Sequence, residues 1–479
     1  MARPWPCHAG LTLTVLKVVG APTRATSHGK NTRMHAPHQP TVLVLLYNRF
    51  SNDSRVLKEC ISLVAAGYRV ELWANYDADL PEHEVMHGFA VHRKFGKPSA
   101  APAQPSQAPA GVLGAARGGA SLLYRLAPRL HDVMKAFYIR LEERVVKTTA
   151  RVYSDFNRFK SRWRKKLRRH TRRSTPPAGV AAVPEFDFIH CNDLLPLPLA
   201  VAMKERDPRI KIIYDSHEYQ TESASVLGNP AKKRRFEQLE RDNIDDADAV
   251  ILVGESIARE YQRLYRLPRV HVVRNCPPLT SPPARHNYFR DKFKLADDDL
   301  IFLYQGGLVR HLRGLEETLN CFVRLYRDGY TRHHMVFMGY GNLEETIEAQ
   351  AAQHPNIHFH PAVAPDDITQ VSSSADYGTF LAPNNCLSYY YCLPNKLFEY
   401  IVCGLPVVST PLFDMQALIQ REGIGYITAD FSEQAMYDTI RRIDARPSPA
   451  ERARIQALHR DKYNWDIEER TLLDVYRHA

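Results

Sequence analysis

The sequence predicts an α/β protein in which two domains, each a doubly wound parallel sheet, face each other across a cleft. Its 479 residues exceed the roughly 100–200 residues of one domain. Apolar runs of strand length alternate with amphipathic helical patterns, and this alternation occurs on both sides of a proline-rich segment at 276–283. Ligands of such sheets bind at the carboxyl ends of the strands, so the cleft is the expected site.

The first domain is predicted to span residues 41–275. It begins with Thr41-Val-Leu-Val-Leu-Leu-Tyr47, an unbroken apolar run typical of a parallel strand buried on both faces. Ser54 to Ala66 has the pattern of a helix, and Gly67 ends it. Further strands are expected at 69–74, 186–190, 210–214, 249–253 and 270–273, and further helices from 194, at about 230–244 and at 255–265.

The second domain is predicted over 276–461, and a last helix over 462–479. Residues 1–40 contain no acidic residue and no sustained periodicity, so we expect a disordered or misassigned extension. The true start is then Met1 or Met34, and a targeting peptide is the alternative. The strands of the second domain are expected at 300–304, 334–338, 356–359, 376–381, 406–408 and 424–427.

The first domain is predicted to carry an insertion over 98–183 that is flexible and then basic and helical. Residues 98–119 are rich in Pro, Ala, Gly and Ser. Residues 121–173 hold 17 Lys and Arg against four Asp and Glu, so this segment alone accounts for the net charge of +11. Within it, 156–173 has the pattern of a basic amphipathic helix whose aromatic stripe is Phe156, Phe159 and Trp163.

Such a helix suits an anionic membrane surface. Packing of the stripe on the domain is an alternative; a nucleic-acid surface is a weaker one, and no nucleic-acid partner is expected. No stretch reaches the ~18 consecutive apolar residues of a membrane span. The eight cysteines form no Cys-x-x-Cys pair, which indicates reduced thiols in the cytoplasm, although a Cys386–Cys392 disulfide stays open. We expect a cytoplasmic protein, peripheral on the inner face of the membrane.

Two glycine-containing turns follow predicted strands of the second domain. In Gln305-Gly306-Gly307 the glycines let the backbone approach a ligand closely, and Arg313 lies near the start of the next helix, where anions bind. Gly339 occupies the same place after a neighbouring strand. Ordinary turns and a solvated arginine are the alternative.

The stretch 393–408 is the most informative. Pro394 suits the first turn of a helix, which places Asn395 and Lys396 at the N-terminus, where N–H groups and the helix dipole attract anions. Glu399 lies one turn later, where a carboxylate can accept two hydrogen bonds from a ribose diol. A generic capped helix would explain the composition alone.

With these motifs the chain resembles glycosyltransferase family 4, the retaining enzymes of the GT-B fold also called glycosyl transferases group 1. The resemblance covers most of 41–479, and the order and spacing of the motifs carry it. They are Asn52-Asp-Ser-Arg-Val-Leu-Lys58, Tyr214-Asp-Ser-His-Glu218, Val273-Arg-Asn275, Tyr304-Gln-Gly-Gly-Leu308, Arg313-Gly-Leu315, Met338-Gly-Tyr-Gly341, the 393–408 stretch and Tyr463-Asn-Trp465.

The resemblance implies a sugar transferase that uses a nucleotide-diphosphate sugar and acts on a glycan or lipid-linked acceptor in cell-surface polysaccharide biosynthesis. It implies that Glu399 binds the ribose and that Arg313 and Lys396 neutralise the diphosphate without a metal or cofactor. The last helix would cross back to the first domain. Asn52, Asp53, Arg55 and Glu218 would line the acceptor side, and Asp193, His217 and Asn192 are the catalytic or positioning candidates. Asp297-Asp-Asp299 resembles a metal motif but fits a solvated turn better.

Two positions depart from the family pattern. Tyr391 stands where a second glutamate is often found, and Asn192 stands where a histidine is often found. They leave the donor sugar open and keep two alternatives: a nucleotide-sugar epimerase of the same fold, and a non-catalytic glycan- or membrane-binding protein. Donor hydrolysis without an acceptor would separate an enzyme from a binding protein.

Overall fold

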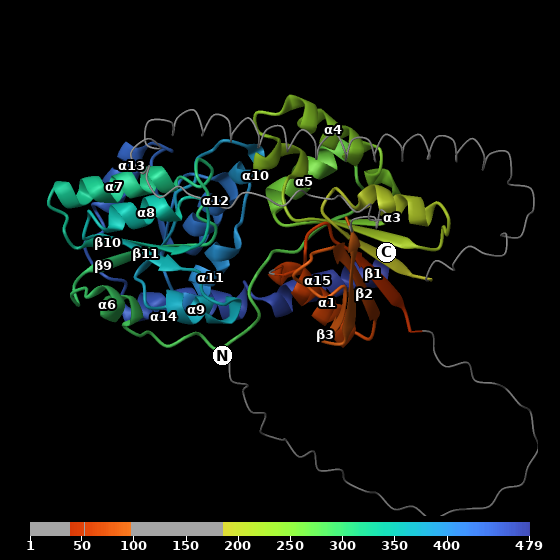
Figure 1. Ribbon diagram of the computed structural model, residues 1–479, viewed down its shortest axis with the longest axis horizontal. Coiled ribbons are helices and arrows are strands. Elements are labelled where there is room, and N and C mark those ends of the chain that lie inside the picture. The colour runs from red at the N-terminus through yellow and green to blue at the C-terminus, as the bar shows by residue number, and fades with distance from the viewer. Residues whose placement is uncertain (1–38, 52, 97–184) are drawn as a thin grey trace, which may run out of the picture.

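The computed structural model describes residues 39–51, 53–96 and 185–479, which form two α/β domains side by side (Figure 1). The predicted insertion at 98–183 lies outside the described residues, as do Asn52 and all but the last two residues of the predicted extension. Among the described helices, none combines the length and apolar composition needed to cross a bilayer.

The first domain is built on an eight-stranded sheet with the order β3-β4-β2-β1-β5-β6-β7-β8. Every neighbouring pair is parallel except β3 and β4. The switch in strand order lies between β1 and β5, as in doubly wound folds. The strands are β1 (Thr41–Leu45), β2 (Arg69–Asn75), β3 (His83–Met86), β4 (Phe89–Phe95), β5 (Phe188–Asn192), β6 (Lys211–Ser216), β7 (Ala249–Leu252) and β8 (Val270–Val272).

The β3–β4 hairpin was not predicted. His87 and Gly88 connect its strands with φ of 47° and 85°, the positive values that a tight two-residue turn of this kind requires. Histidine rather than Asn or Asp precedes the glycine, so the usual hairpin signal is weak here.

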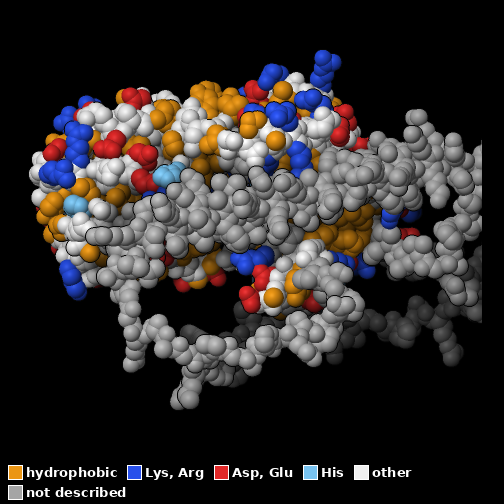
Figure 2. All heavy atoms as spheres, turned by 45° about the horizontal axis from the view of Figure 1, so that its top comes forward, with side chains coloured by type: hydrophobic (Ala, Val, Ile, Leu, Met, Phe, Trp, Pro, Cys, Tyr) orange, Lys and Arg blue, Asp and Glu red, His pale blue; other side chains and the backbone are white. Residues whose placement is uncertain are grey.

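The described helices within this domain are α1 (Ser54–Ala65), α3 (Leu197–Lys204), α4 (Pro230–Arg241) and α5 (Glu255–Tyr265). Asp53 caps α1, because its carboxylate accepts a bond of 3.2 Å from the Val56 N–H. Helix α4 begins with Pro230 and carries consecutive cations over 232–235. Figure 2 shows Lys and Arg side chains on the edge of the molecule where α4 lies.

The second domain is built on a fully parallel sheet with the order β11-β10-β9-β12-β13-β14. Its switch point lies between β9 and β12, so the turns after these strands open the crevice where ligands bind in such folds. The strands are β9 (Leu300–Gln305), β10 (His333–Gly339), β11 (Ile357–Pro361), β12 (Tyr377–Phe380), β13 (Val407–Ser409) and β14 (Gly425–Ile427).

The helices around this sheet are α6 (Tyr288–Phe293), α7 (Leu315–Arg327), α8 (Glu344–Ala351), α9 (Ile368–Ser372), α10 (Leu387–Tyr390), α11 (Asn395–Cys403), α12 (Phe413–Glu422), α13 (Glu433–Ile440) and α14 (Pro449–Asp461). All strands predicted for both domains are present, and their ends differ from the predicted ones by at most two residues. The long apolar runs explain this agreement, because a strand buried on both faces has an unbroken hydrophobic sequence.

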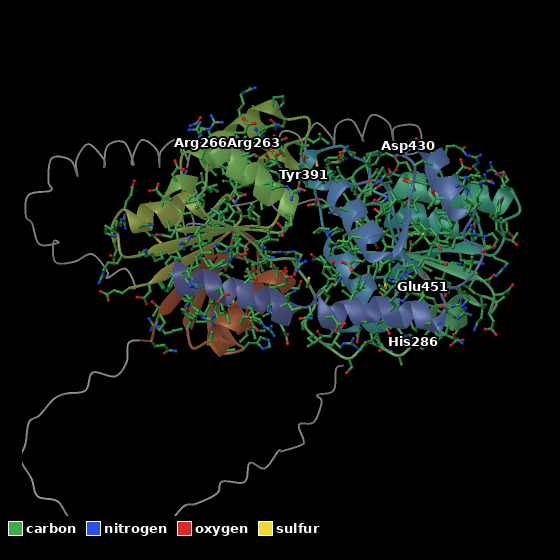
Figure 3. The ribbon with its side chains drawn as sticks, turned by 180° about the vertical axis from the view of Figure 1, so that it is seen from behind. Arg263, Arg266, His286, Tyr391, Asp430 and Glu451 are labelled. Carbon is green, nitrogen blue, oxygen red and sulfur yellow. The ribbon has the colours of Figure 1, made fainter. Side chains whose placement is uncertain are left out.

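The chain crosses between the domains at 273–277 and again before α15 (Trp465–His478), which packs on α1 of the first domain. Figure 3 shows α14, which carries Glu451, along the second domain and α15 continuing across the first. The Trp465 N–H donates to the Pro277 carbonyl at 2.8 Å, so the two crossings are bonded to each other. The Trp465 indole also donates to the Ser62 hydroxyl of α1 at 2.9 Å.

We expect Trp465→Ala to destabilise the first domain strongly, because the side chain is only 6% exposed and anchors the crossing helix. Truncation of a buried tryptophan costs about 3–5 kcal/mol. Calorimetry should show the earliest unfolding transition at a lower temperature. Arg477→Ala, which removes an exposed side chain from the same helix, is the matched control. Equal transition temperatures for the two variants would contradict the anchoring role.

Candidate functional site

A cleft of about 590 Å³ lies between the two domains. Both domains contribute charged and polar side chains to it, as expected for a site that holds two substrates. The first domain contributes, among others, Asn48, Arg49, Asp53, Arg55, His217, Glu218 and Asn275, and the second contributes Arg313, Phe380, Ser388, Tyr389, Cys392 and Asn395.

Lys396 stands at the N-terminus of α11 and points toward the first glycine turn. Its ammonium lies 4.9 Å and 5.0 Å from the ring centres of Tyr304 and Phe380. A Cβ on Gly306 would lie 3.3 Å from this nitrogen, so glycine leaves the amine its place. Burial, together with the nearby Arg313 guanidinium, lowers the pKa of Lys396 to about 7. Among the described residues, no carboxylate forms an ion pair with Lys396.

Arg313 is a second cation on this side. Its guanidinium lies 5.1 Å from the ring centre of Tyr389, and no ion pair with a carboxylate is formed within the described part of the chain. The next residue, Gly314, has φ of 67°, and a Cβ there would meet the Leu381 carbonyl oxygen at 2.1 Å. Glycine therefore lets α7 begin directly against the turn after β12, which fixes Arg313 at the cleft.

Glu399 lies one turn into α11, and the side chain of Gln305 donates a hydrogen bond to its Oε2. Gln305 in turn accepts a bond of 2.5 Å from the Ser372 hydroxyl, which fixes its amide. Burial raises the pKa of Glu399 above its usual value. The last residue of β9 thus orients the carboxylate that the sequence predicted to bind a ribose.

The two glycine turns pack against each other. A Cβ on Gly339 would lie 1.9 Å from the Gly306 carbonyl oxygen, and the Gly306 N–H donates to the Met338 carbonyl at 2.9 Å. Gly339 therefore allows the turn after β10 to support the turn formed by Gly306 and Gly307. Its described contacts are with this neighbouring turn.

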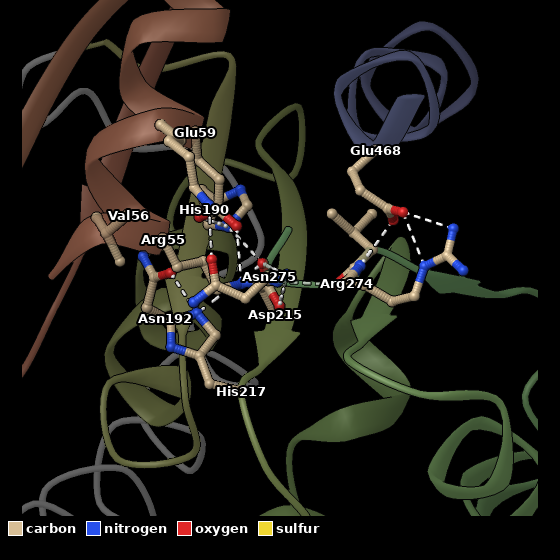
Figure 4. A network of polar contacts seen from close by, with 12 residues as sticks. Arg55, Val56, Glu59, His190, Asn192, Asp215, His217, Arg274, Asn275 and Glu468 are labelled. Atoms are coloured by element: carbon tan, nitrogen blue, oxygen red, sulfur yellow. Dashed lines mark hydrogen bonds and ion pairs between the residues drawn. The ribbon is translucent and has the colours of Figure 1, made fainter. Parts of the chain in front are cut away.

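On the other side of the cleft, Arg55 forms a buried network (Figure 4). Its guanidinium contacts both carboxylate oxygens of Asp215 at 2.7 and 2.9 Å, donates to the Val273 carbonyl at 2.7 Å and pairs with Glu59 at 2.9 Å. Burial opposes ionisation of Asp215, but the Arg55 charge, the His190 hydrogen bond and the charge of His217 together outweigh it, so the pKa of Asp215 lies well below its usual value. His190 lies 3.4 Å from the Asp215 carboxylate and bonds Tyr476 of α15 at 2.8 Å.

Arg55 was expected to face the substrates, and it borders the cleft. It is only 2% exposed, because its guanidinium is turned toward Asp215 at the end of β6, and its contact with a substrate stays a prediction. Asp53 also borders the cleft and bonds Asn48 at 2.9 Å besides capping α1.

Asn192 is 1% exposed at the end of β5, where its Oδ1 lies 3.1 Å from His217 Nε2, so the described contact of this oxygen is with the histidine. The catalytic role suggested for Asn192 stays a prediction. Asp193, with φ of 62°, accepts bonds from the His217 N–H at 3.0 Å and the Gln220 amide at 2.8 Å. These two residues therefore position His217, which borders the cleft.

Glu218 reaches toward the second domain. Its carboxylate accepts a bond of 3.3 Å from the Ser388 hydroxyl, a contact across this rim of the cleft. At the same rim, the Asp414 carboxylate of α12 accepts bonds from the hydroxyl and the N–H of Ser256 in α5, at 2.5 and 3.4 Å. Burial, with a smaller contribution from Asp193, raises the pKa of Glu218 to about 6.

Among the described residues, one group has spacing that could hold a metal ion: Glu59, His190 and Asp215. The Arg55 guanidinium lies within 2.9 Å of both carboxylates, so this cluster already contains its own cation. Of the 297–299 turn, Asp298 pairs with Arg332 at 3.1 Å and Asp299 accepts a backbone bond of 2.7 Å. These contacts fit a structural turn.

Tyr391 and the pair Cys386 and Cys392 were also singled out from the sequence. Tyr391 packs its ring near Tyr390 and Phe413, at centroid distances of 5.2 and 5.9 Å, so no carboxylate occupies that position. Figure 3 shows Tyr391 at the edge of the domain boundary opposite α14 and α15. Cys386 and Cys392 are both free thiols, and the suggested disulfide is therefore wrong.

Several site residues were missed, among them Gln305, Ser388, Tyr389, Lys58 and Asn275. Gln305 and Asn275 stand inside the quoted motifs, so their position next to glycine turns and the hinge was the available signal. Lys58 also stands inside a quoted motif, but its contact with the distant hinge segment could not be read from the sequence.

We expect the affinity for a nucleoside diphosphate to fall as the pH rises above 7. The anion binds the protonated form of Lys396, so binding raises its pKa and is weakened once the free amine loses its proton. Titration calorimetry with UDP should show about a fivefold loss between pH 7 and pH 8. UDP itself is fully ionised there, since the second phosphate pKa is about 6.

Lys396→Arg is the control, because its guanidinium stays charged and should flatten this dependence. A wild-type affinity that is constant across this range would show that Lys396 does not contact the anion.

Two family models match the chain. The model described as glycosyl transferase 4-like domain matches residues 54–276, and that described as glycosyl transferases group 1 matches 299–445. No curated protein matches the sequence.

Solved structures with the same fold include three that the chain overlays almost throughout. Sucrose-phosphate synthase from Thermosynechococcus elongatus is 16% identical, with a TM-score of 0.58 over 92% of this chain and 98% of that one. HepE from Anabaena in complex with UDP-glucose is 12% identical, with a TM-score of 0.57 over 92% and 100%. WaaG, a glycosyltransferase involved in lipopolysaccharide biosynthesis, is 13% identical, with a TM-score of 0.53 over 91% and 99%.

At these identities the solved structures establish the fold, and the family models establish the family. The two models together span both domains, including the Arg313 turn and helix α11. The protein therefore belongs to the group 1 glycosyl transferases and is a glycosyltransferase with the GT-B fold.

Proposed function

We propose that the protein transfers a sugar, with retention and without a metal or cofactor, from a nucleoside-diphosphate donor to a glycan or lipid-linked acceptor. One observation carries the proposal. Arg313 borders the cleft and lies near Lys396, which directly follows the cleft residue Asn395, and neither cation forms an ion pair within the described residues. A partly buried cation without a counter-ion costs free energy, and an anionic ligand would supply the missing partner.

The chemistry follows from the charge of the leaving group. As the bond between the sugar and the diphosphate breaks, negative charge grows on the phosphate oxygens. Lys396, Arg313 and the N–H groups at the start of α11 are fixed before the reaction, so they stabilise this charge without reorganisation. Glu399 accepts two hydrogen bonds from the ribose hydroxyls and sets the position of the diphosphate.

Retention requires the acceptor to attack from the face that the diphosphate leaves. The acceptor hydroxyl oxygen forms the new bond to the sugar, and its proton passes to the departing phosphate oxygen, so no side chain acts as a nucleophile. His217 and Glu218 border the cleft from the first domain and are placed to bind the acceptor.

UDP-glucose is the first donor to test. HepE from Anabaena was solved with UDP-glucose, and the trehalose-6-phosphate protein from E. coli with UDP-2-fluoro glucose, on the same fold. The base and the sugar of the natural donor are then compared within a panel of nucleotide sugars.

The acceptor is proposed to belong to a cell-surface polysaccharide and to be reached at the cytoplasmic face of the membrane. The basic segment 156–173 supports this, although it lies outside the described residues. The cations at 232–235 of α4 add positive charge on the described surface (Figure 2). WaaG, which shares the fold, is involved in lipopolysaccharide biosynthesis.

We expect Glu399→Ala to weaken UDP binding tenfold or more, because hydrogen bonds to a charged group contribute about 1.5–3 kcal/mol each. Titration calorimetry measures the affinity, and product analysis with UDP-glucose measures slow release of free glucose. Glu399→Gln, which keeps an acceptor oxygen, should lose less. If the wild type binds no nucleoside diphosphate, the proposal fails. If it produces an epimerised nucleotide sugar in place of free glucose, the epimerase alternative replaces it.

We expect the full chain to sediment with vesicles that contain phosphatidylglycerol, and less so at high salt. Each basic residue near such a surface contributes about 1 kcal/mol. A variant with glutamine at Arg162, Arg164, Lys165 and Lys166 should sediment less. The control is a variant in which four Lys or Arg residues within 125–144 are replaced by glutamine instead. Equal sedimentation of the three proteins would contradict a membrane role for 156–173.

A further inference from the structure

Lys58 lies on α1 of the first domain, and its side chain reaches the hinge. Its ammonium donates to the Asn275 side-chain oxygen at 2.7 Å and to the Cys276 carbonyl at 2.5 Å. It also lies 4.7 Å from the centre of the Trp465 ring. The hinge thus accepts two hydrogen bonds from this ammonium group, which has three donors, and the crossing helix contributes an aromatic ring beside it. In the described part of the chain, no carboxylate pairs with Lys58.

Asn275 carries the contact into the second domain. Its amide nitrogen donates to the Asn395 side-chain oxygen at 2.9 Å. Asn395 is the first residue of α11, directly before Lys396, and borders the cleft. Two consecutive hydrogen bonds therefore connect the acceptor domain with the first turn of the helix proposed to bind the diphosphate.

We infer that Lys58 is a positioning residue for the donor site, which acts through Asn275 on Asn395 and so on the N-terminal turn of α11. The inference rests on the proposed function, because it takes this turn to be the diphosphate site. Lys58 donates to the side-chain oxygen of Asn275 and thereby determines which way the amide nitrogen points. That nitrogen holds Asn395, and the backbone N–H groups beside Lys396 keep the orientation that an anion needs.

The charge of Lys58 acts in the same direction. It is a third cation without a carboxylate partner among the described residues, after Lys396 and Arg313, and it lies behind the start of α11. A fixed positive charge in a poorly solvated place strengthens the field that an anionic ligand meets. A neutral side chain of similar length would lose both the hydrogen bonds and this field.

A purely mechanical role for Lys58 predicts something different, and the hinge itself offers the control. On its other side, Arg274 is held by Glu468 of α15 through contacts of 2.6 and 2.7 Å. This clamp grips the adjacent residue of the same hinge, but it has no hydrogen bond to α11. Loosening it should change stability without changing the affinity for a nucleotide.

The test is a double-mutant cycle on UDP affinity, measured by titration calorimetry at pH 7 together with the melting temperature of each protein. We expect Lys58→Met and Asn395→Ala each to weaken binding about five- to tenfold, the effect of one lost hydrogen-bonded link. The double variant should be no weaker than the weaker single one, because both changes break the same chain of contacts. Glu468→Gln should lower the melting temperature and change the affinity less than about twofold.

Additive losses in the double variant, or an unchanged affinity of Lys58→Met, would overturn the inference. Asn275→Ala removes the middle link without touching α1, and it takes the place of Lys58→Met in the cycle if that variant does not fold. The proposed function and the positioning role of Lys58 are refuted by different results. A wild type that binds no nucleoside diphosphate refutes the proposed function, whereas UDP binding that depends on Glu399 but not on Lys58 refutes only the positioning role.

Discussion

The ion pair between Arg55 and Asp215 is the interaction on which the cleft depends. Arg55 belongs to a polar stripe of α1 whose members are spaced three and four residues apart: Arg55, Lys58, Glu59 and Ser62. Each of them contacts a different segment, namely β6, the hinge, β5 and the crossing helix. Removing one partner of such a buried pair costs about 3–5 kcal/mol, because the other charge is left uncompensated. One face of α1 therefore connects the segments that form the first-domain side of the cleft.

The donor side follows the opposite principle. Here the cations are not neutralised by the fold, since Lys396 and Arg313 have aromatic rings and glycine backbone as neighbours. The lowered pKa of Lys396 shows that burial and the Arg313 charge disfavour its protonated form. Charges without partners lower the stability of the folded protein, and an anionic ligand would supply the opposite charge. In a poorly solvated position each such contact is stronger than it would be in water.

The sequence was sufficient for the strands of both sheets, apart from the β3–β4 hairpin, and for the start of helix α11, because both signals are local. An apolar run of strand length and a Pro-Asn-Lys helix start are visible in a few neighbouring residues. Arg55 and Asn192 were assigned to the substrates by the resemblance to the family. Their side chains pair with Asp215 and His217, each more than twenty residues away, and a single sequence carries no information on such pairing.

Both crossings of the chain lie at one edge of the domain boundary and are bonded to each other through Trp465 and Pro277. At the opposite rim the domains meet through the contacts of Glu218 with Ser388 and of Ser256 with Asp414. Main-chain and tryptophan contacts thus join the domains at one edge, whereas side-chain contacts, these hydrogen bonds among them, join them at the opposite rim. A hinge motion about the first edge would separate the contacts of the opposite rim before those of the two crossings.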